Sequence, residues 1–129
     1  MLFLIAGSED PLYEISLGAT PSDHLSQFIV HAALDRVEGV SKTSPLRYHR
    51  NIDSFNDQVV SAYVTAGGIK FLLLHTGADE ACIREFLSTV HEQYVKLCLN
   101  PFYKRDSEIT SEKFDRAVRA AAARLLVPQ

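Results

Sequence analysis

The chain has 129 residues, of which 47% are hydrophobic and 22% charged, and its formal net charge is −3. This length fits one domain, since a single core typically holds roughly 100–150 residues, and the apolar content excludes a disordered chain. The weak acidity argues against nucleic acid, whose binding needs clustered Lys and Arg. The two cysteines form no disulfide framework and indicate a reducing compartment. We therefore expect one compact intracellular domain over residues 1–129.

The apolar runs of the sequence are too short for a membrane segment. Residues 1–6 have no basic leader and are soon followed by Glu9 and Asp10, and residues 69–74 contain Lys70. A secretory signal needs a longer run behind positive charge, and a spanning helix needs ~20 apolar residues. We expect a cytoplasmic protein with no direct membrane insertion.

The first third of the chain predicts a hairpin and then a helix. Residues 2–6 are apolar throughout, as in a strand covered on both faces, and residues 12–17 alternate as a strand does. Ser22 or Asp23 can cap a helix that ends at Gly39. The apolar stripe of this helix is wide, so the helix either lies deep or keeps one flank for a partner.

The middle of the chain predicts three further strands. Residues 46–52 are polar, as in an edge strand, and residues 58–65 are rich in β-branched and aromatic side chains. Gly67 and Gly68 fit a two-residue hairpin turn that leads into a strand at residues 69–75. Both faces of that strand are apolar, which predicts helices on both faces of the sheet.

Two helices complete the predicted fold. Asp79 can cap the first, which ends before Asn100 because a residue that precedes proline disfavours the helical conformation. The last helix begins at about Thr110. The order β-β-α-β-β-β-α-α, with local hairpins, predicts an α+β three-layer sandwich around an antiparallel sheet, as in longin-like or profilin-like domains.

The sequence contains no pattern that indicates catalysis, a cofactor or a metal. The five histidines are scattered, and none has a partner at the one-turn spacing of a helical metal site. Cys82 and Cys98 lie on one predicted helix about 24 Å apart, too far to pair or to share a metal. Nucleophile-elbow, phosphate-loop and dinucleotide patterns are absent, and no Ser-His-Asp set can be placed. We expect a protein that is not an enzyme.

Two segments are candidates for binding another protein. The first helix combines excess apolar surface with a charged end, and a loop after the second helix carries two aromatic side chains. Aromatic residues in loops anchor either a local core or a partner, and the sequence leaves both readings open. The candidate partner-binding residues are Val30, Leu34, Asp35, Arg36, Glu38, Phe102 and Tyr103.

Five segments of the chain resemble the sedlin family, whose members are small subunits of the TRAPP vesicle-tethering complex. They are QFIVHAALD at residues 27–35, VSAYVTAG at 60–67, KFLLLH at 70–75, LNPFY at 99–103 and FDR at 114–116. The segments occur in the family's order and span essentially the whole chain. The resemblance implies a longin-like fold with a five-stranded antiparallel sheet, one helix on one face and two on the other.

The resemblance also implies a function and partners. It implies a non-catalytic adaptor in transport from the endoplasmic reticulum to the Golgi, peripheral to those membranes and to the intermediate compartment. The implied partners are other TRAPP subunits, both small core subunits and a larger one, and indirectly a Rab GTPase. Asp35 would contact the larger subunit, whereas Ser61 and Phe71 would pack inside the domain. The predicted core residues are Phe28, Ser61, Phe71, Leu73, Phe86 and Phe114.

The sequence departs from the family pattern at two places and leaves alternatives open. The stretch at residues 18–23 is short for the family, and Arg36 follows Asp35 where an apolar residue is more usual. A sedlin-like paralogue or a small clathrin-adaptor-like chain are the trafficking alternatives. A small hydrolase or isomerase would need a pocket with converging polar groups.

Overall fold

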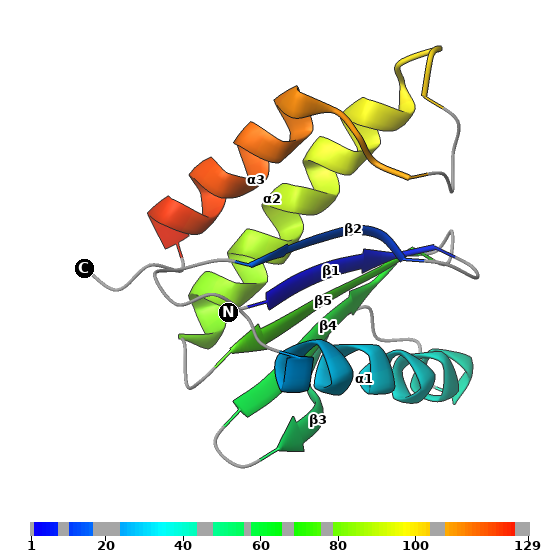
Figure 1. Cartoon of the computed structure of the whole chain (residues 1–129), viewed down its shortest axis with the longest axis vertical. Coiled ribbons are helices and arrows are strands. Elements are labelled where there is room, and N and C mark those ends of the chain that lie inside the picture. Colours follow the sequence, from blue (N-terminus) through cyan, green and yellow to red (C-terminus); the bar gives the residue numbers. More distant parts are fainter. Residues whose placement is uncertain are drawn as a thin grey trace.

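The computed structural model of the chain describes residues 2–7, 11–16, 24–43, 48–55, 58–65, 69–75, 79–103 and 108–125. These residues form an α+β fold in which three helices cover an antiparallel sheet (Figure 1). The strands are β1 (Leu2–Ala6), β2 (Pro11–Ser16), β3 (Tyr48–Phe55), β4 (Gln58–Val64) and β5 (Lys70–His75). The helices are α1 (His24–Thr43), α2 (Glu80–Cys98) and α3 (Glu112–Leu125). This order is the one that the sequence predicts.

The sheet has the strand order β2-β1-β5-β4-β3, and every neighbouring pair is antiparallel. The central strand β5 is buried along its whole length, which explains why the sequence shows no polar alternation there. The polar strand β3 lies at the edge, as predicted, but it spans Tyr48–Phe55 instead of residues 46–52.

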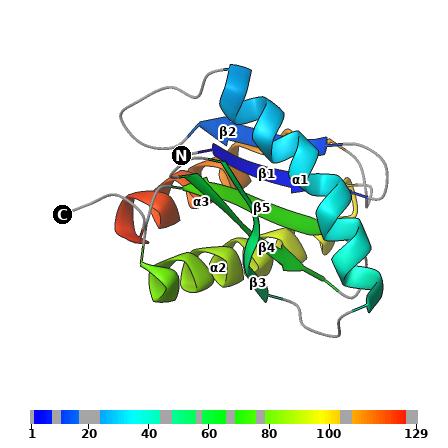
Figure 2. The ribbon, with the colours of Figure 1, turned by 90° about the horizontal axis from the view of Figure 1, so that it is seen from below.

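Alternating side chains of the sheet build two separate cores, one on each face. On one face α1 lies across the sheet, which Figure 2 shows from below. On the other face α2 and α3 lie side by side (Figure 1). The α1-side core includes Leu2, Leu4, Val60, Ala62, Leu72 and Leu74 from the strands. The α2/α3-side core includes Phe3, Ile5, Phe71, Leu73, Phe86 and Phe114.

The two helices on the larger core begin at side-chain caps. The Asp79 carboxylate accepts a hydrogen bond of 2.9 Å from the Ala81 N–H, as the sequence predicts for this position. The Ser111 hydroxyl accepts one of 3.2 Å from the Phe114 N–H at the start of α3. This helix therefore begins at Glu112, slightly after the predicted start.

Helix α3 is fastened to the edge strand β2. The Tyr13 hydroxyl donates a hydrogen bond to the Asp115 carboxylate, which also accepts one of 2.8 Å from the Arg119 guanidinium. These two donors lower the pKa of Asp115, the Tyr13 hydroxyl more than the guanidinium. The Ile109 N–H adds a backbone hydrogen bond of 2.9 Å to the Leu12 carbonyl.

Two expectations for α1 are wrong. The helix passes through Gly39 and ends at Thr43, because one glycine costs a helix only about 1 kcal/mol, which packing of the helix on the sheet offsets. Phe28 was expected in the core, yet its side chain is 70% exposed. The predicted cap at Ser22 or Asp23 and the turn at residues 67–68 lie outside the described residues.

Candidate functional site

Helix α1 has two unlike faces. One face packs on the sheet through buried apolar side chains, which are Ile29, Val30, Ala33 and Val37. The opposite face is exposed, and its positions recur at intervals of three or four residues, as one side of a helix requires. We refer to this surface as the α1 outer face, and its residues are Phe28, Ala32, Asp35, Arg36 and Gly39.

The structure corrects which apolar residues of α1 a partner could reach. Val30 is completely buried, and Leu34 is half-buried against the α1-side core, so neither is an exposed binding residue. Phe28 replaces them as the large apolar side chain on the outer face. Asp35 and Arg36 are exposed on that face, as expected of contact residues. The side chain of Glu38 lies outside the described part of the chain.

A small polar contact borders the α1 outer face. The His31 imidazole lies 3.3 Å from the Glu14 carboxylate of the edge strand β2, and both side chains are partly exposed. An exposed pair of this kind contributes roughly 0–1 kcal/mol. The pair therefore adds little to the stability of the contact between α1 and β2.

The loop after α2 separates its two aromatic residues. The Asn100 side chain accepts a hydrogen bond of 2.9 Å from the Phe102 N–H, and the Tyr103 N–H donates one of 3.1 Å to the Asn100 carbonyl. In this tight turn Phe102 is 95% exposed. Tyr103 instead packs edge-on against Tyr94, with ring centroids 6.3 Å apart. The structure thus gives Tyr103 the local-core role and leaves only Phe102 accessible to a partner.

One Ser-His pair does form, inside the domain. The Ser61 hydroxyl lies 2.9 Å from Nε2 of His75 on the neighbouring strand, and both residues are buried. Burial lowers the pKa of His75, and its Nδ1 has no hydrogen-bond partner among the described residues. A catalytic histidine needs a group that orients this nitrogen and access to substrate. The arrangement fits a structural polar pair in the core, in which the Ser61 hydroxyl satisfies Nε2 of His75 but not Nδ1.

The described residues offer neither a metal-binding cluster nor a membrane-spanning helix. They contain no cluster of three or more His, Cys, Asp or Glu side chains that could bind a metal ion. No helix among them has both the length and the apolar content to cross a membrane. Cys82 and Cys98 are free thiols in half-buried positions on α2.

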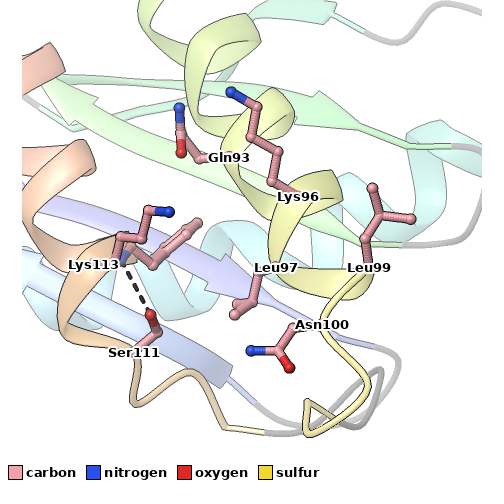
Figure 3. A pocket seen from close by; sticks show the side chains of 8 residues that line it. Gln93, Lys96, Leu97, Leu99, Asn100, Ser111 and Lys113 are labelled. Atoms are coloured by element: carbon pink, nitrogen blue, oxygen red, sulfur yellow. Dashed lines mark hydrogen bonds between the residues drawn. The ribbon is translucent and has the colours of Figure 1, made fainter.

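A pocket of about 340 Å³ lies between the end of α2 and the start of α3 (Figure 3). Its lining residues are Gln93, Lys96, Leu97, Leu99, Asn100, Ser111, Lys113 and Phe114. The sequence did not predict it, because its two walls come from segments that only the fold brings together. A partial signal was present in Leu99, an exposed apolar residue directly after α2 that lines the pocket.

Comparisons with known proteins give the chain a family. A family model described as sedlin matches residues 4–124. The "Transport protein particle 20 kDa subunit" of Schizosaccharomyces pombe is 37% identical over 95% of this chain and 96% of its own. The "Probable trafficking protein particle complex subunit 2" of Caenorhabditis elegans is 41% identical, over 72% of this chain and 66% of its own. The "Trafficking protein particle complex subunit 2-like protein" of Rattus norvegicus is 28% identical over 89% of this chain and 90% of its own. With a family model that covers most of its length, the chain belongs to the sedlin family.

Proposed function

We propose that the chain is a non-catalytic adaptor subunit of a TRAPP vesicle-tethering particle, and that its α1 outer face binds a larger subunit. The observation that carries the proposal is that α1 exposes the aromatic ring of Phe28 on the same face as Asp35 and Arg36, two helical turns before them and opposite its buried face. Aromatic anchors are enriched at protein interfaces, and charged residues on the same surface contribute to the choice of partner. The names of the relatives, which are trafficking particle subunits, support the same conclusion.

We also propose the transport step, the location and the further partners of the chain. The adaptor acts in transport from the endoplasmic reticulum to the Golgi, in the cytoplasm and peripheral to those membranes and the intermediate compartment. It also contacts small core subunits, and its link to a Rab GTPase is indirect, through the assembled particle. The buried state of the Ser61–His75 pair supports a role without catalysis.

We infer that the chain forms one longin-like domain over residues 1–129 and that it is the subunit 2 type. The sheet with helices on both faces and the family match over residues 4–124 support the domain. The identity to the two subunits named 20 kDa and 2 exceeds the identity to the 2-like protein, which favours the first type over the paralogue.

The test compares the subunits that co-purify with tagged wild-type chain and with two variants, Asp35→Ala and Phe28→Ser. Both side chains are exposed, so we expect the thermal midpoint to change little and recovery of the larger subunit to fall. Glu85→Ala is the matched control, because Glu85 is an exposed acidic residue on α2, in the opposite layer.

The possible outcomes distinguish an error in the assigned binding surface from an error in the proposed function. Wild-type recovery of the larger subunit by both variants would disprove the assignment of the α1 outer face. A wild-type chain that recovers no TRAPP subunit at all would disprove the proposed function itself.

A further inference from the structure

The pocket is lined by residues at the end of α2 and the start of α3. These two helices lie on the face of the sheet opposite α1 (Figure 1), so the pocket is separate from the α1 outer face. Its volume of about 340 Å³ lies near the lower end of the range for ligand pockets, roughly 300–1,000 Å³. A space of this size accommodates one large side chain and its neighbours in a peptide, but not a folded domain.

The pocket has an apolar part that continues onto the surface. Leu97 and Phe114 belong to or pack against the α2/α3-side core, and Leu99 is 78% exposed at the rim. Val95 lies one helical turn before Leu99 and is 46% exposed. Together these side chains offer an apolar contact that water covers in the isolated chain, which favours an apolar or aromatic anchor.

The charged part of the pocket is entirely cationic. Lys96 comes from α2 and Lys113 from α3, and both side chains are exposed (Figure 3). The other polar lining residues, Gln93, Asn100 and Ser111, are uncharged. Neither lysine makes an ion pair with another described residue. The chain as a whole carries a net charge of −3, so the two lysines of the pocket are opposite in sign to the net charge of the protein.

We propose that this pocket binds a peptide segment in which a Phe or Leu side chain is flanked by Asp or Glu. The apolar side chain would contact Leu97, Leu99 and Phe114, and the carboxylates would meet the ammonium groups of the two lysines. Charge complementarity of this kind selects the partner and speeds its association more than it adds affinity. The chain would then join two partners, one on each helical layer.

The test begins with a phage-displayed library of short random peptides that is selected on the full chain. The library is depleted beforehand on the double variant Lys96→Glu/Lys113→Glu, so that only peptides dependent on the lysines remain. We expect the enriched peptides to place Phe or Leu next to at least two acidic residues. The strongest of them is then synthesised and titrated by fluorescence polarisation, with amide chemical shifts used to locate its site.

Charge reversal of the two lysines should weaken the synthetic peptide at least about tenfold, because two favourable pairs become repulsive. Arg116→Glu/Arg124→Glu is the matched control. It changes the net charge equally, and it replaces exposed residues of α3 that do not line the pocket. The variant Leu99→Ser tests the apolar part and should also weaken binding, without a change in fold since Leu99 is exposed.

Three results would overturn the proposal. The first is that no enriched peptide binds more tightly than about 1 mM. The second is an equal loss of affinity in the arginine control, which would show that only net charge matters. The third is that vesicles of phosphatidylcholine and phosphatidylserine bind the chain only when both lysines are present, whereas the affinity of the peptide does not depend on the lysines. This result would assign the pocket to a membrane surface.

Discussion

Phe71 shows how one side chain can hold a sheet and a helical layer together. It lies on the central strand β5 with no exposed surface, and its ring stacks with Phe3 at a centroid distance of 6.5 Å. From the helical side, Tyr94 contacts it edge-on at 6.1 Å. The ring therefore links β1, β5 and α2 in one cluster.

The substitution Phe71→Ser should destabilise the domain by at least about 3–5 kcal/mol, because it leaves a cavity and buries a hydroxyl group. Urea unfolding followed by circular dichroism measures this loss. Phe102→Ser is the matched control, since the Phe102 side chain is 95% exposed and its loss should change the free energy of unfolding by no more than about 0.5 kcal/mol. Equal midpoints for the two variants would contradict the burial of Phe71.

His75 gives the stability a dependence on pH. Burial lowers its pKa below the ordinary 6.5, so the unfolded chain binds more protons between the two pKa values. The free energy of unfolding that depends on neutral His75 is therefore fully present above about pH 6.5 and decreases as the pH falls through 6.5. Below the pKa of His75 in the folded state, the free energy of unfolding no longer changes with the protonation of this residue.

We expect the free energy of unfolding to fall between about pH 7.5 and about pH 5, and to fall less in His75→Gln. Glutamine retains a polar group next to Ser61 but does not titrate. Urea titrations of both proteins at several pH values measure the two slopes. Identical slopes would mean that His75 is not the residue responsible.

At the scale of an element, α1 contains a glycine, Gly39, which is not at a helix end and lies on the α1 outer face. A Cβ placed on Gly39 would meet nothing within 4 Å, so no steric reason requires a glycine there for folding. Glycine in a helix costs roughly 0.5–1 kcal/mol relative to alanine. Its position beside Asp35 and Arg36 is compatible with close approach by a partner.

Gly39→Ala should therefore raise the free energy of unfolding by about 0.5–1 kcal/mol. If the partner packs closely on the α1 outer face, the same variant should recover less of the larger subunit. Thermal melts and co-purification of one preparation give both readouts. A destabilised variant would show that the backbone at Gly39 is not an ordinary helical one.

The contact between β2 and α3 is the other feature at this scale. Tyr13→Phe removes the hydroxyl that donates to Asp115 and should cost about 1 kcal/mol, a typical value for one hydrogen bond. Amide hydrogen exchange should speed up in β2 and at the start of α3, and remain unchanged in α1 on the other face. Uniform acceleration in all three elements would indicate a global effect instead.

At the scale of the whole molecule, the sheet separates two candidate surfaces by placing α1 on one face and α2 and α3 on the other (Figure 2). Substitutions at distant sites without shared partners usually act independently. Asp35→Ala should therefore leave the affinity for the selected acidic peptide unchanged, and Lys96→Glu/Lys113→Glu should leave recovery of the larger subunit unchanged. Cross-effects in either measurement would show that the two layers are coupled.

The sequence alone predicted the type and order of the elements in the part of the chain that the structure describes. Runs of period two or of continuous apolar character define the strands, as at residues 69–75, and a 3.6-residue period defines the helices. Apolar side chains on both faces of β5 also predicted helices on both sides of the sheet. These features are local in sequence, or follow directly from the need to bury apolar surface.

Only the tertiary structure decided how those elements face one another. The stripe of α1 is wide enough to allow several rotations about its axis, and packing selected the one that buries Val30 and exposes Phe28. The pocket depends on Lys96 and Lys113, which are far apart in the chain and become neighbours only when α2 and α3 pack. The pattern of buried residues in one element can be predicted from neighbouring residues in the sequence, whereas a binding surface consists of residues that only the fold brings together.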